Sequence, residues 1–484
     1  MDNFVGWLNN VLWSPPLIIL CIVVGLFFSI ATRFLQLRLI PDMLRQMFRG
    51  KSSDAGISSF QALSVALSGR VGTGNIAGVA TAIGLGGPGA VFWMWLIAFV
   101  GAATAYVEST LAQIYKVKQD GEYRGGPAYY IEKGTGMRWY GIVFAVATII
   151  SLTFLMPGVQ ANAIAEGLNN AFGMNKILTA TIIAVLLGII IFGGVKRIAG
   201  VAQFVVPFMA LGYIIVALII ILINFSEIPA VFALIFKSAF GAEATFGGIV
   251  GSAISWGVKR GIYSNEAGQG TGAHAAGAAE VSHPAKQGLV QAFSVYIDTW
   301  FVCTATAFMI LFTGMFSTKA PDGTYLADKM GTADPGPQYT QAAVESVLPG
   351  FGSGFVAISL FFFAFTTIMA YYYMSETNVA YLTRGKNNRW AILAIKIVSM
   401  AAVFYGCVKT SEVAWAFGDT GLGIMVWLNI IAVLILMKPA LVALKDYERQ
   451  KREGKDPVFD PEPLGIKNAE YWVEKKTEDK QEVS

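Results

Sequence analysis

Charge is scarce in this chain of 484 residues, of which only 14% are Asp, Glu, Lys or Arg while 55% are hydrophobic. A soluble domain usually has about 25% charged residues, so this chain lacks the polar side chains that would cover a large water-exposed surface. Apolar segments long enough to cross a bilayer recur instead, such as those that end at Thr32 and Gly194. The composition therefore predicts an all-α polytopic protein embedded in a lipid bilayer.

Residues that bind metals or act as nucleophiles are also scarce. Cys21, Cys303 and Cys407 each lie in an apolar stretch, and His274 and His283 share no ligand spacing with them. This pattern excludes a structural zinc site. It also argues against a membrane-embedded enzyme, which would need a convergent nucleophile or metal set, so we expect no catalytic residue. The net charge of +4 sits mostly in loops and near the C-terminus, where it indicates membrane orientation and not nucleic-acid binding.

The hydropathy pattern predicts about 11 transmembrane helices. Lysine and arginine gather in the connectors after the first, third, fifth and ninth of these spans, and again in the polar segment after Pro439, which we expect to be solvated. Positive residues stay in the cytoplasm. We therefore expect the N-terminus outside and the C-terminus inside, which requires an odd number of spans.

Two segments do not fit continuous helices, because glycine is dense in the middle of each. They read "SGRVGTGNIAGVATAIGLGGPG" at 68–89 and "SWGVKRGIYSNEAGQGTGAHAAGAA" at 255–279. Five spans separate equivalent points of the two segments, so they cross the membrane in opposite senses. That arrangement is typical of inverted five-helix repeats whose first helices are discontinuous. The expected organisation is an extra N-terminal helix with its connector at 1–50, a first repeat at 51–225, a second repeat at 226–445 and a cytoplasmic tail at 446–484.

A broken helix inside a membrane favours ligand binding, because unpaired backbone groups are too costly in lipid unless something satisfies them. The N-terminus of a half-helix offers N–H groups to a carboxylate, and the C-terminus of the other half offers carbonyls to a cation. Glycine lets a ligand approach the backbone and permits a positive φ. The alternative is that these glycines serve close helix packing. A dinucleotide-binding loop at Gly72, Gly74 and Gly78 is excluded, since the spacing differs and no strand precedes it.

Several segments together identify a family. The chain resembles the alanine or glycine:cation symporter family, the sodium:alanine symporters, in "ALSGRVGTGNIAGVATAIGLGGPGAVFWMW", "GGPAYYIEKG", "KRGIYSNEAGQGTGAHAAGAAEVSHPAKQG", "FAFTTIMAYYYMSET" and "AWAFGDTGLGIMVWLN". The resemblance implies a LeuT-like fold with one extra N-terminal helix in a bacterial plasma membrane. It also implies sodium-coupled uptake of small neutral amino acids, namely alanine and also glycine. We expect sodium binding to stabilise the outward-open state, so that the two gradients are coupled by linkage.

The resemblance also implies site residues. The backbone N–H groups of Thr73 and Gly74 would bind the substrate carboxylate. The full substrate-binding set is Gly72, Thr73, Gly74, Asn75, Gln160, Asn265 and Tyr371. The sodium ligands would be the carbonyls of Ser68 and Val71 and the hydroxyls of Thr366 and Thr367.

Each of these roles has a structural alternative. A threonine in mid-helix often bonds the carbonyl four residues back. Gln160 would otherwise join two helices by a hydrogen bond, and Asn265 would otherwise cap the broken helix. Tyr371 stands where many members of the family carry tryptophan, which puts the size of the pocket and its substrate range in question.

Charged residues within predicted spans complete the candidate set. Asp298 would either line a cation path or form a structural or gating ion pair with Arg70, Lys259 or Arg260, and we favour the ion pair. Arg70, beside the first break, is a candidate for an inner gate. Asp298 and Glu266 keep open a proton-coupled transporter of the same fold. An ion channel is the remaining alternative, although broken helices in two inverted halves suit alternating access better.

Overall fold

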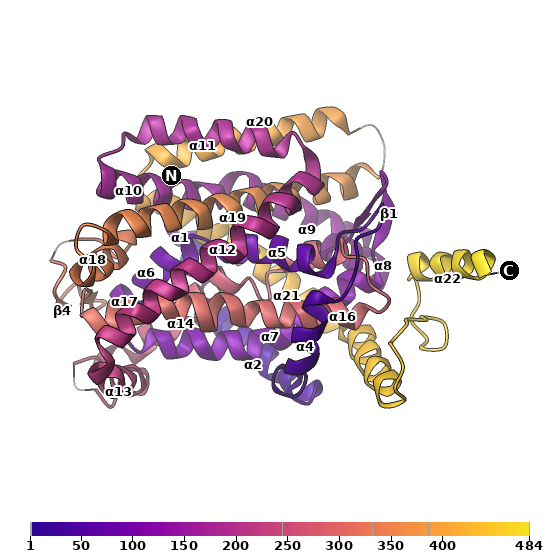
Figure 1. Ribbon diagram of the computed structural model, residues 1–484, viewed down its shortest axis with the longest axis horizontal. Coiled ribbons are helices and arrows are strands. Elements are labelled where there is room, and N and C mark those ends of the chain that lie inside the picture. The colour runs from indigo at the N-terminus through magenta and orange to yellow at the C-terminus, as the bar shows by residue number, and fades with distance from the viewer. Residues whose placement is uncertain (1, 244, 332, 385–387, 484) are drawn as a thin grey trace.

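The computed structural model describes residues 2–243, 245–331, 333–384 and 388–483. Most of its long helices lie nearly parallel to one another (Figure 1). By length and composition, 8 helices in these ranges could cross a membrane. The other predicted spans are two broken helices and a helix of 16 residues, Lys176–Ile191. The helical membrane fold is therefore confirmed, whereas the number eleven stays a prediction.

The N-terminal half begins with a kinked helix and continues through the first broken helix. Proline stands in the first turn of α2, α4, α8 and α10, where its missing N–H has no helical partner to lose. The elements are α1 (Asp2–Leu12), α2 (Pro15–Ala31), α3 (Leu35–Arg38), α4 (Ile40–Phe48), α5 (Ser59–Arg70), η1 (Gly74–Gly78), α6 (Val79–Gly86), α7 (Ala90–Ile114), β1 (Val117–Gln119), β2 (Glu122–Arg124), α8 (Pro127–Thr135), α9 (Arg138–Ile150), η2 (Ser151–Leu155), α10 (Pro157–Phe172), α11 (Lys176–Ile191) and α12 (Gly194–Ile223).

The C-terminal half repeats much of this order. Its elements are η3 (Phe225–Glu227), α13 (Ile228–Ala239), η4 (Gly247–Ile249), α14 (Val250–Asn265), α15 (Gly272–Gly277), α16 (Pro284–Val295), η5 (Tyr296–Cys303), α17 (Thr304–Thr313), β3 (Ser317–Lys319), β4 (Tyr325–Asp328), α18 (Pro337–Val347), α19 (Gly352–Thr383), α20 (Arg389–Val408), α21 (Ser411–Arg452) and α22 (Glu470–Val483). The expected repeat boundary at 225 lies in η3, and the boundary at 445 lies inside α21.

A small motif supports the internal repeat. In each half a β-hairpin is followed by Gly-Pro-x-Tyr and a short helix: Pro127 and Tyr129 open α8, and Pro337 and Tyr339 open α18. The two short helices lie at opposite ends of the bundle, α8 on the right and α18 on the left (Figure 1). The half-helices agree with this inversion, because α5 packs against α15 while α6 packs against α14. The two broken helices therefore run antiparallel, side by side.

The outer surface of the bundle is apolar. On α12, Phe204, Phe208 and Leu211 expose 76%, 82% and 61% of their surface. Contiguous apolar exposure of this extent is rare on soluble monomers. This face is therefore suited to lipid.

The C-terminal tail differs from the expected solvated segment. Helix α21 runs on to Arg452, and the chain then returns to the bundle, where Trp472 is buried and its indole donates to the Gln113 carbonyl at 2.9 Å. The Lys116 ammonium lies 4.5 Å and 5.2 Å from the ring centroids of Tyr471 and Trp472. The apolar area that docks this segment comes from three buried aromatic side chains, Phe459, Tyr471 and Trp472.

Candidate functional site

The first break lies between α5 and η1, and side chains hold the backbone there. The Gly72 N–H donates to Asn75 Oδ1 at 2.8 Å, and the Thr73 N–H donates to Gln160 Oε1 at 2.9 Å. All four residues are buried. The Thr73 N–H, an expected donor to the substrate carboxylate, is thus held by an amide oxygen in this structure.

Several oxygen atoms gather around one hydroxyl at the C-terminal end of α5. Thr367 Oγ1 lies 2.9 Å from the Ser68 carbonyl, 3.1 Å from the Phe363 carbonyl and 3.5 Å from the Val71 carbonyl. A hydroxyl has one proton to donate, so the other carbonyls keep lone pairs facing this point. Oxygen-only ligands suit a hard cation, and the end of a helix adds negative partial charge.

The neighbouring threonine contacts the Phe363 carbonyl of this cluster but makes no hydrogen bond to the Ser68 or Val71 carbonyl in the described residues. The Thr366 hydroxyl donates to the Phe363 carbonyl of its own helix at 2.9 Å. The structure therefore brings Ser68, Val71 and Thr367 together as expected for a cation site, but it does not bring the Thr366 hydroxyl to them.

Glycine at the first break is needed for space and not for a positive φ. Neither Gly72 nor Gly74 has a positive φ, so the conformational part of our expectation is wrong here. A Cβ on Gly72 would lie 2.3 Å from Thr367 Oγ1 and 2.9 Å from Gln160 Oε1. A Cβ on Gly74 would lie 3.1 Å from the Ser264 Cα of the second broken helix.

The second break, between α14 and α15, is longer and uses left-handed backbone. Glu266, Gly268 and Gly270 have φ of +58°, +93° and +84°. Asn265 caps this break, because its Oδ1 accepts the Ala267 N–H at 3.0 Å. The amide of Asn265 does not meet Gln160, so the structure does not join these two predicted substrate residues.

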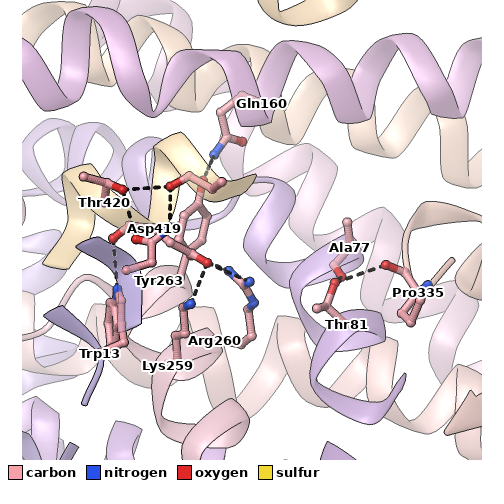
Figure 2. Close-up of polar contacts among 12 residues, drawn as sticks. Trp13, Ala77, Thr81, Gln160, Lys259, Arg260, Tyr263, Pro335, Asp419 and Thr420 are labelled. Atoms are coloured by element: carbon pink, nitrogen blue, oxygen red, sulfur yellow. Dashed lines mark hydrogen bonds and ion pairs between the residues drawn. The ribbon is translucent and has the colours of Figure 1, made fainter. Parts of the chain in front are cut away.

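Polar side chains meet between the breaks. Gln160 Nε2 donates to the Tyr263 hydroxyl at 3.4 Å (Figure 2). Tyr371 is fully buried beside the same two side chains. The groups of Gly72 and Thr73 at the first break complete this mostly uncharged cluster, which is the candidate substrate pocket.

Asp298 joins the two broken helices and forms none of the expected ion pairs. Its carboxylate accepts from Asn75 Nδ2 at 2.6 Å, from Ser264 Oγ at 2.9 Å and from Thr299 Oγ1 at 2.7 Å. Arg70 bonds elsewhere, to Gln291 at 3.3 Å and to Ser294. Three neutral donors can satisfy a buried carboxylate without a salt bridge, so the role of Asp298 in this structure is to tie Asn75 of the first break to Ser264 of the second.

The expected basic partners bind a different acid. Lys259 and Arg260 contact the Asp419 carboxylate at 2.7 Å and 2.8 Å (Figure 2). The Arg260 guanidinium also lies 4.0 Å from the Trp415 ring centroid, and Trp415 packs on Tyr263. This buried charged cluster therefore covers the Tyr263 side of the pocket. Sequence reasoning missed Asp419, although an acid inside the apolar stretch "AWAFGDTGLG" was a sufficient signal.

Comparison with known families now decides the class of protein. The pattern of the sodium:alanine symporter family matches residues 1–461. This chain belongs to the sodium:alanine symporter family. The symporter is a membrane transporter and not an enzyme.

Relatives cover nearly the whole symporter. YrbD of Bacillus subtilis (strain 168), named as a sodium/proton-dependent alanine carrier, is 67% identical over 100% of both chains. The sodium/proton-dependent alanine carrier protein of Bacillus sp. (strain PS3) is 58% identical over 89% of this chain and 97% of its own. GlnT of Bacillus subtilis (strain 168), named for sodium/glutamine symport, is 44% identical over 98% and 96%.

Solved structures support the fold of the symporter. MhsT in complex with L-phenylalanine aligns with a TM-score of 0.52 at 14% identity, covering 81% of this chain and 98% of that one. A manganese transporter of Eremococcus coleocola aligns with a TM-score of 0.50 at 12% identity, covering 86% and 94%. Both have the LeuT fold, so the fold expected from the sequence is confirmed.

Proposed function

We propose that this symporter imports small neutral amino acids, alanine first and glycine with it, by coupling them to sodium. The observation that carries the proposal is the oxygen cluster of Thr367, Ser68 and Val71. It adjoins the pocket of Gly72 and Gln160, so a cation and a zwitterion would bind at one break. Sodium at this point would fix the end of α5 and so prepare the pocket for substrate.

The substrate carboxylate would take the place of an internal hydrogen bond. We expect it to accept the Thr73 N–H that Gln160 now holds, and Gln160 would then turn its amide N–H groups to the ligand. Because the Gln160 side chain already satisfies this N–H, no buried donor is left without a partner when substrate is absent. The empty site therefore costs the protein little stability. Tyr371, buried beside Gln160, limits the space and favours alanine over larger amino acids.

Access would alternate between the two ends of the bundle. The cluster of Lys259, Arg260 and Asp419 lies near the junction of α1 and α2, where the Trp13 indole donates to the Asp419 carbonyl at 2.9 Å. With the N-terminus outside, as the charge pattern predicts, this cluster closes the outer side of the bacterial inner membrane. The tail would close the cytoplasmic side.

Protons are the second candidate for the coupling ion. Two of the relatives are named as sodium/proton-dependent carriers, and the buried carboxyl groups of Glu266 and Asp298 could take up a proton. The same fold would then use the pH gradient in place of, or together with, the sodium gradient.

Uptake by purified protein in lipid vesicles tests the proposal. We expect an inward sodium gradient to drive accumulation of labelled alanine and glycine, and to drive glutamine poorly. Gln160→Ala should weaken alanine binding about tenfold per folded molecule, or about 1.4 kcal/mol. Gln341→Ala, whose amide bonds the Gly167 and Ser353 carbonyls and none of the predicted substrate residues, should not. Accumulation driven by a pH gradient but not by sodium would favour the proton candidate.

A further inference from the structure

The carboxyl group of Glu266 is the least compensated buried acid beside the second break. Its side chain is fully buried, and neither oxygen has a hydrogen-bond partner within the described residues. The group faces the end of α5, since a Cβ on Gly69 would lie 3.2 Å and 3.4 Å from its two oxygens. A charged carboxylate without donors is very costly to bury, so this group must either bind a cation or carry a proton.

Other unpartnered oxygens lie on the same loop. Thr271 Oγ1 and Gln269 Oε1 are buried and also have no hydrogen-bond partner among the described residues. The Thr271 side chain lies beside the Glu266 carboxyl. The Gln269 side-chain amide, in contrast, donates to the sulfur atoms of Met156 and Met425 at 3.6 Å and 3.8 Å. Oxygen atoms of this kind, with a single carboxylate, are the ligands that a monovalent cation of the alkali group accepts.

The charges around Arg70 do not balance. Three buried carboxyl groups act on its guanidinium, those of Glu266, Asp298 and Glu108. Asp298 has three neutral donors, and Glu108 accepts from the Asn429 amide. Glu266 has no donor within hydrogen-bond distance in the described part of the chain, and Arg70 is the opposite charge that acts on it most strongly.

The remaining titratable groups that act on Glu266 are Tyr263 and Tyr371, and a phenol is uncharged at neutral pH. One guanidinium offsets one carboxylate, so two of the three carboxyl groups need a proton or another cation if the region is to be neutral. The cation at the Thr367 cluster would offset one of them, and one remains.

We propose that Glu266, together with Thr271, binds a second monovalent cation, sodium or a proton, that moves with each alanine. This inference rests on the proposed function and extends it. Alanine is a neutral zwitterion, so every positive charge that crosses the membrane with it belongs to a cation. The symporter then moves two charges per alanine, one bound at Thr367 and one at Glu266.

The test compares charge with alanine flux for the full chain in vesicles. The current, labelled alanine, radioactive sodium and an internal pH dye are recorded together at a fixed membrane potential. The parent is expected to move two charges per alanine and Glu266→Gln one. The matched control is Glu376→Gln on α19, whose carboxyl lies 3.7 Å from the Arg124 guanidinium. This variant should keep two charges per alanine.

The sodium and pH recordings identify the cation. A fall from two sodium ions per alanine to one in Glu266→Gln assigns sodium, whereas loss of alanine-driven acidification at an unchanged sodium ratio assigns a proton. Two charges per alanine in Glu266→Gln, or one in the parent, would overturn the inference. The absence of any sodium-driven alanine flux in the parent would instead overturn the proposed function.

A second variant guards against misfolding of the first. Glu266→Asp keeps the charge but withdraws it by one methylene. We expect two charges per alanine with a rise of about fivefold or more in the half-saturating concentration of the cation. Two charges with unchanged cation affinity would contradict a ligand role for Glu266.

Discussion

The two broken helices achieve the same interruption by different means. The first break spans 71–73, and its glycines have no positive φ. The second spans 266–271 and passes through three residues in left-handed conformations. At the first break glycine leaves room for Thr367 and Gln160, whereas at the second it permits the backbone to turn.

We therefore expect substitutions of glycine at the first break to affect ligand binding, and those at the second break to affect the stability of the fold. A methyl group added at the first break would displace the atoms that we assign to cation and substrate. A methyl group added at the second would strain the chain itself. The predictions below test this separation, beginning with the change of largest expected effect.

Gly72→Ala should nearly abolish transport while the protein still folds. The added Cβ would lie 2.3 Å from Thr367 Oγ1, so it pushes apart the groups that meet at the first break. We expect alanine uptake per folded molecule to fall about 100-fold, or about 2.7 kcal/mol. Gly78→Ala is the control, because its Cβ would have no neighbour closer than 3.8 Å. Equal uptake by both variants would show that the close approach at Gly72 has no function.

Thr367→Val and Thr366→Val should differ although the residues are adjacent. Valine keeps the shape of threonine and removes the oxygen. We expect Thr367→Val to raise the half-saturating sodium concentration about tenfold and Thr366→Val to leave it within about twofold. Sodium titrations of alanine binding measure both. Equal shifts would mean that the rotamer of Thr366 changes when the cation binds.

Gly268→Ala should destabilise the fold without weakening the site. Its φ of +93° disfavours any side chain, while the nearest atom to an added Cβ is the Ile430 Cδ1 at 3.3 Å. The expected loss is about 1–2 kcal/mol in the free energy of unfolding, with alanine affinity per folded molecule unchanged. Thermal unfolding in detergent, paired with a binding titration, gives both numbers. A drop in alanine affinity at normal stability would show that the second break, like the first, contributes to binding.

Asn265→Ala should have the smallest effect. Its Oδ1 accepts the Ala267 N–H, and loss of one such hydrogen bond costs about 1 kcal/mol of stability. Alanine affinity should change by less than about twofold, since the structure does not join this amide to Gln160. A large loss of affinity in this variant would return Asn265 to the substrate pocket. The same two measurements as for Gly268→Ala distinguish these results.

Glycine density predicted where both helices break, but it could not predict why. Whether a glycine provides room or a left-handed φ depends on what packs against it. At Gly72 that neighbour is Thr367, almost 300 residues away. Only the family resemblance suggested this contact, because hydropathy gives the depth of a residue and not the side of the helix on which it lies.

The same limit explains the charged residues. The sequence placed Asp298, Lys259 and Arg260 within spans, and it could not show that Lys259 and Arg260 point to Asp419 instead. Likewise, two adjacent threonines are equivalent by pattern, and only the rotation of α19 distinguishes Thr367 from Thr366. The orientation of the termini and the roles of the site residues stay predictions.

The docked tail matters to anyone who engineers this protein. The family pattern stops at residue 461, which makes that position an inviting place to shorten the chain or to fuse a fluorescent reporter. A cut there would remove Trp472 and Lys475, which bind the Gln113 carbonyl and the Glu280 carboxylate. The first of these partners lies at the end of α7 and the second follows α15, so a shortened chain would report on a transporter in which the ends of both helices have lost contacts.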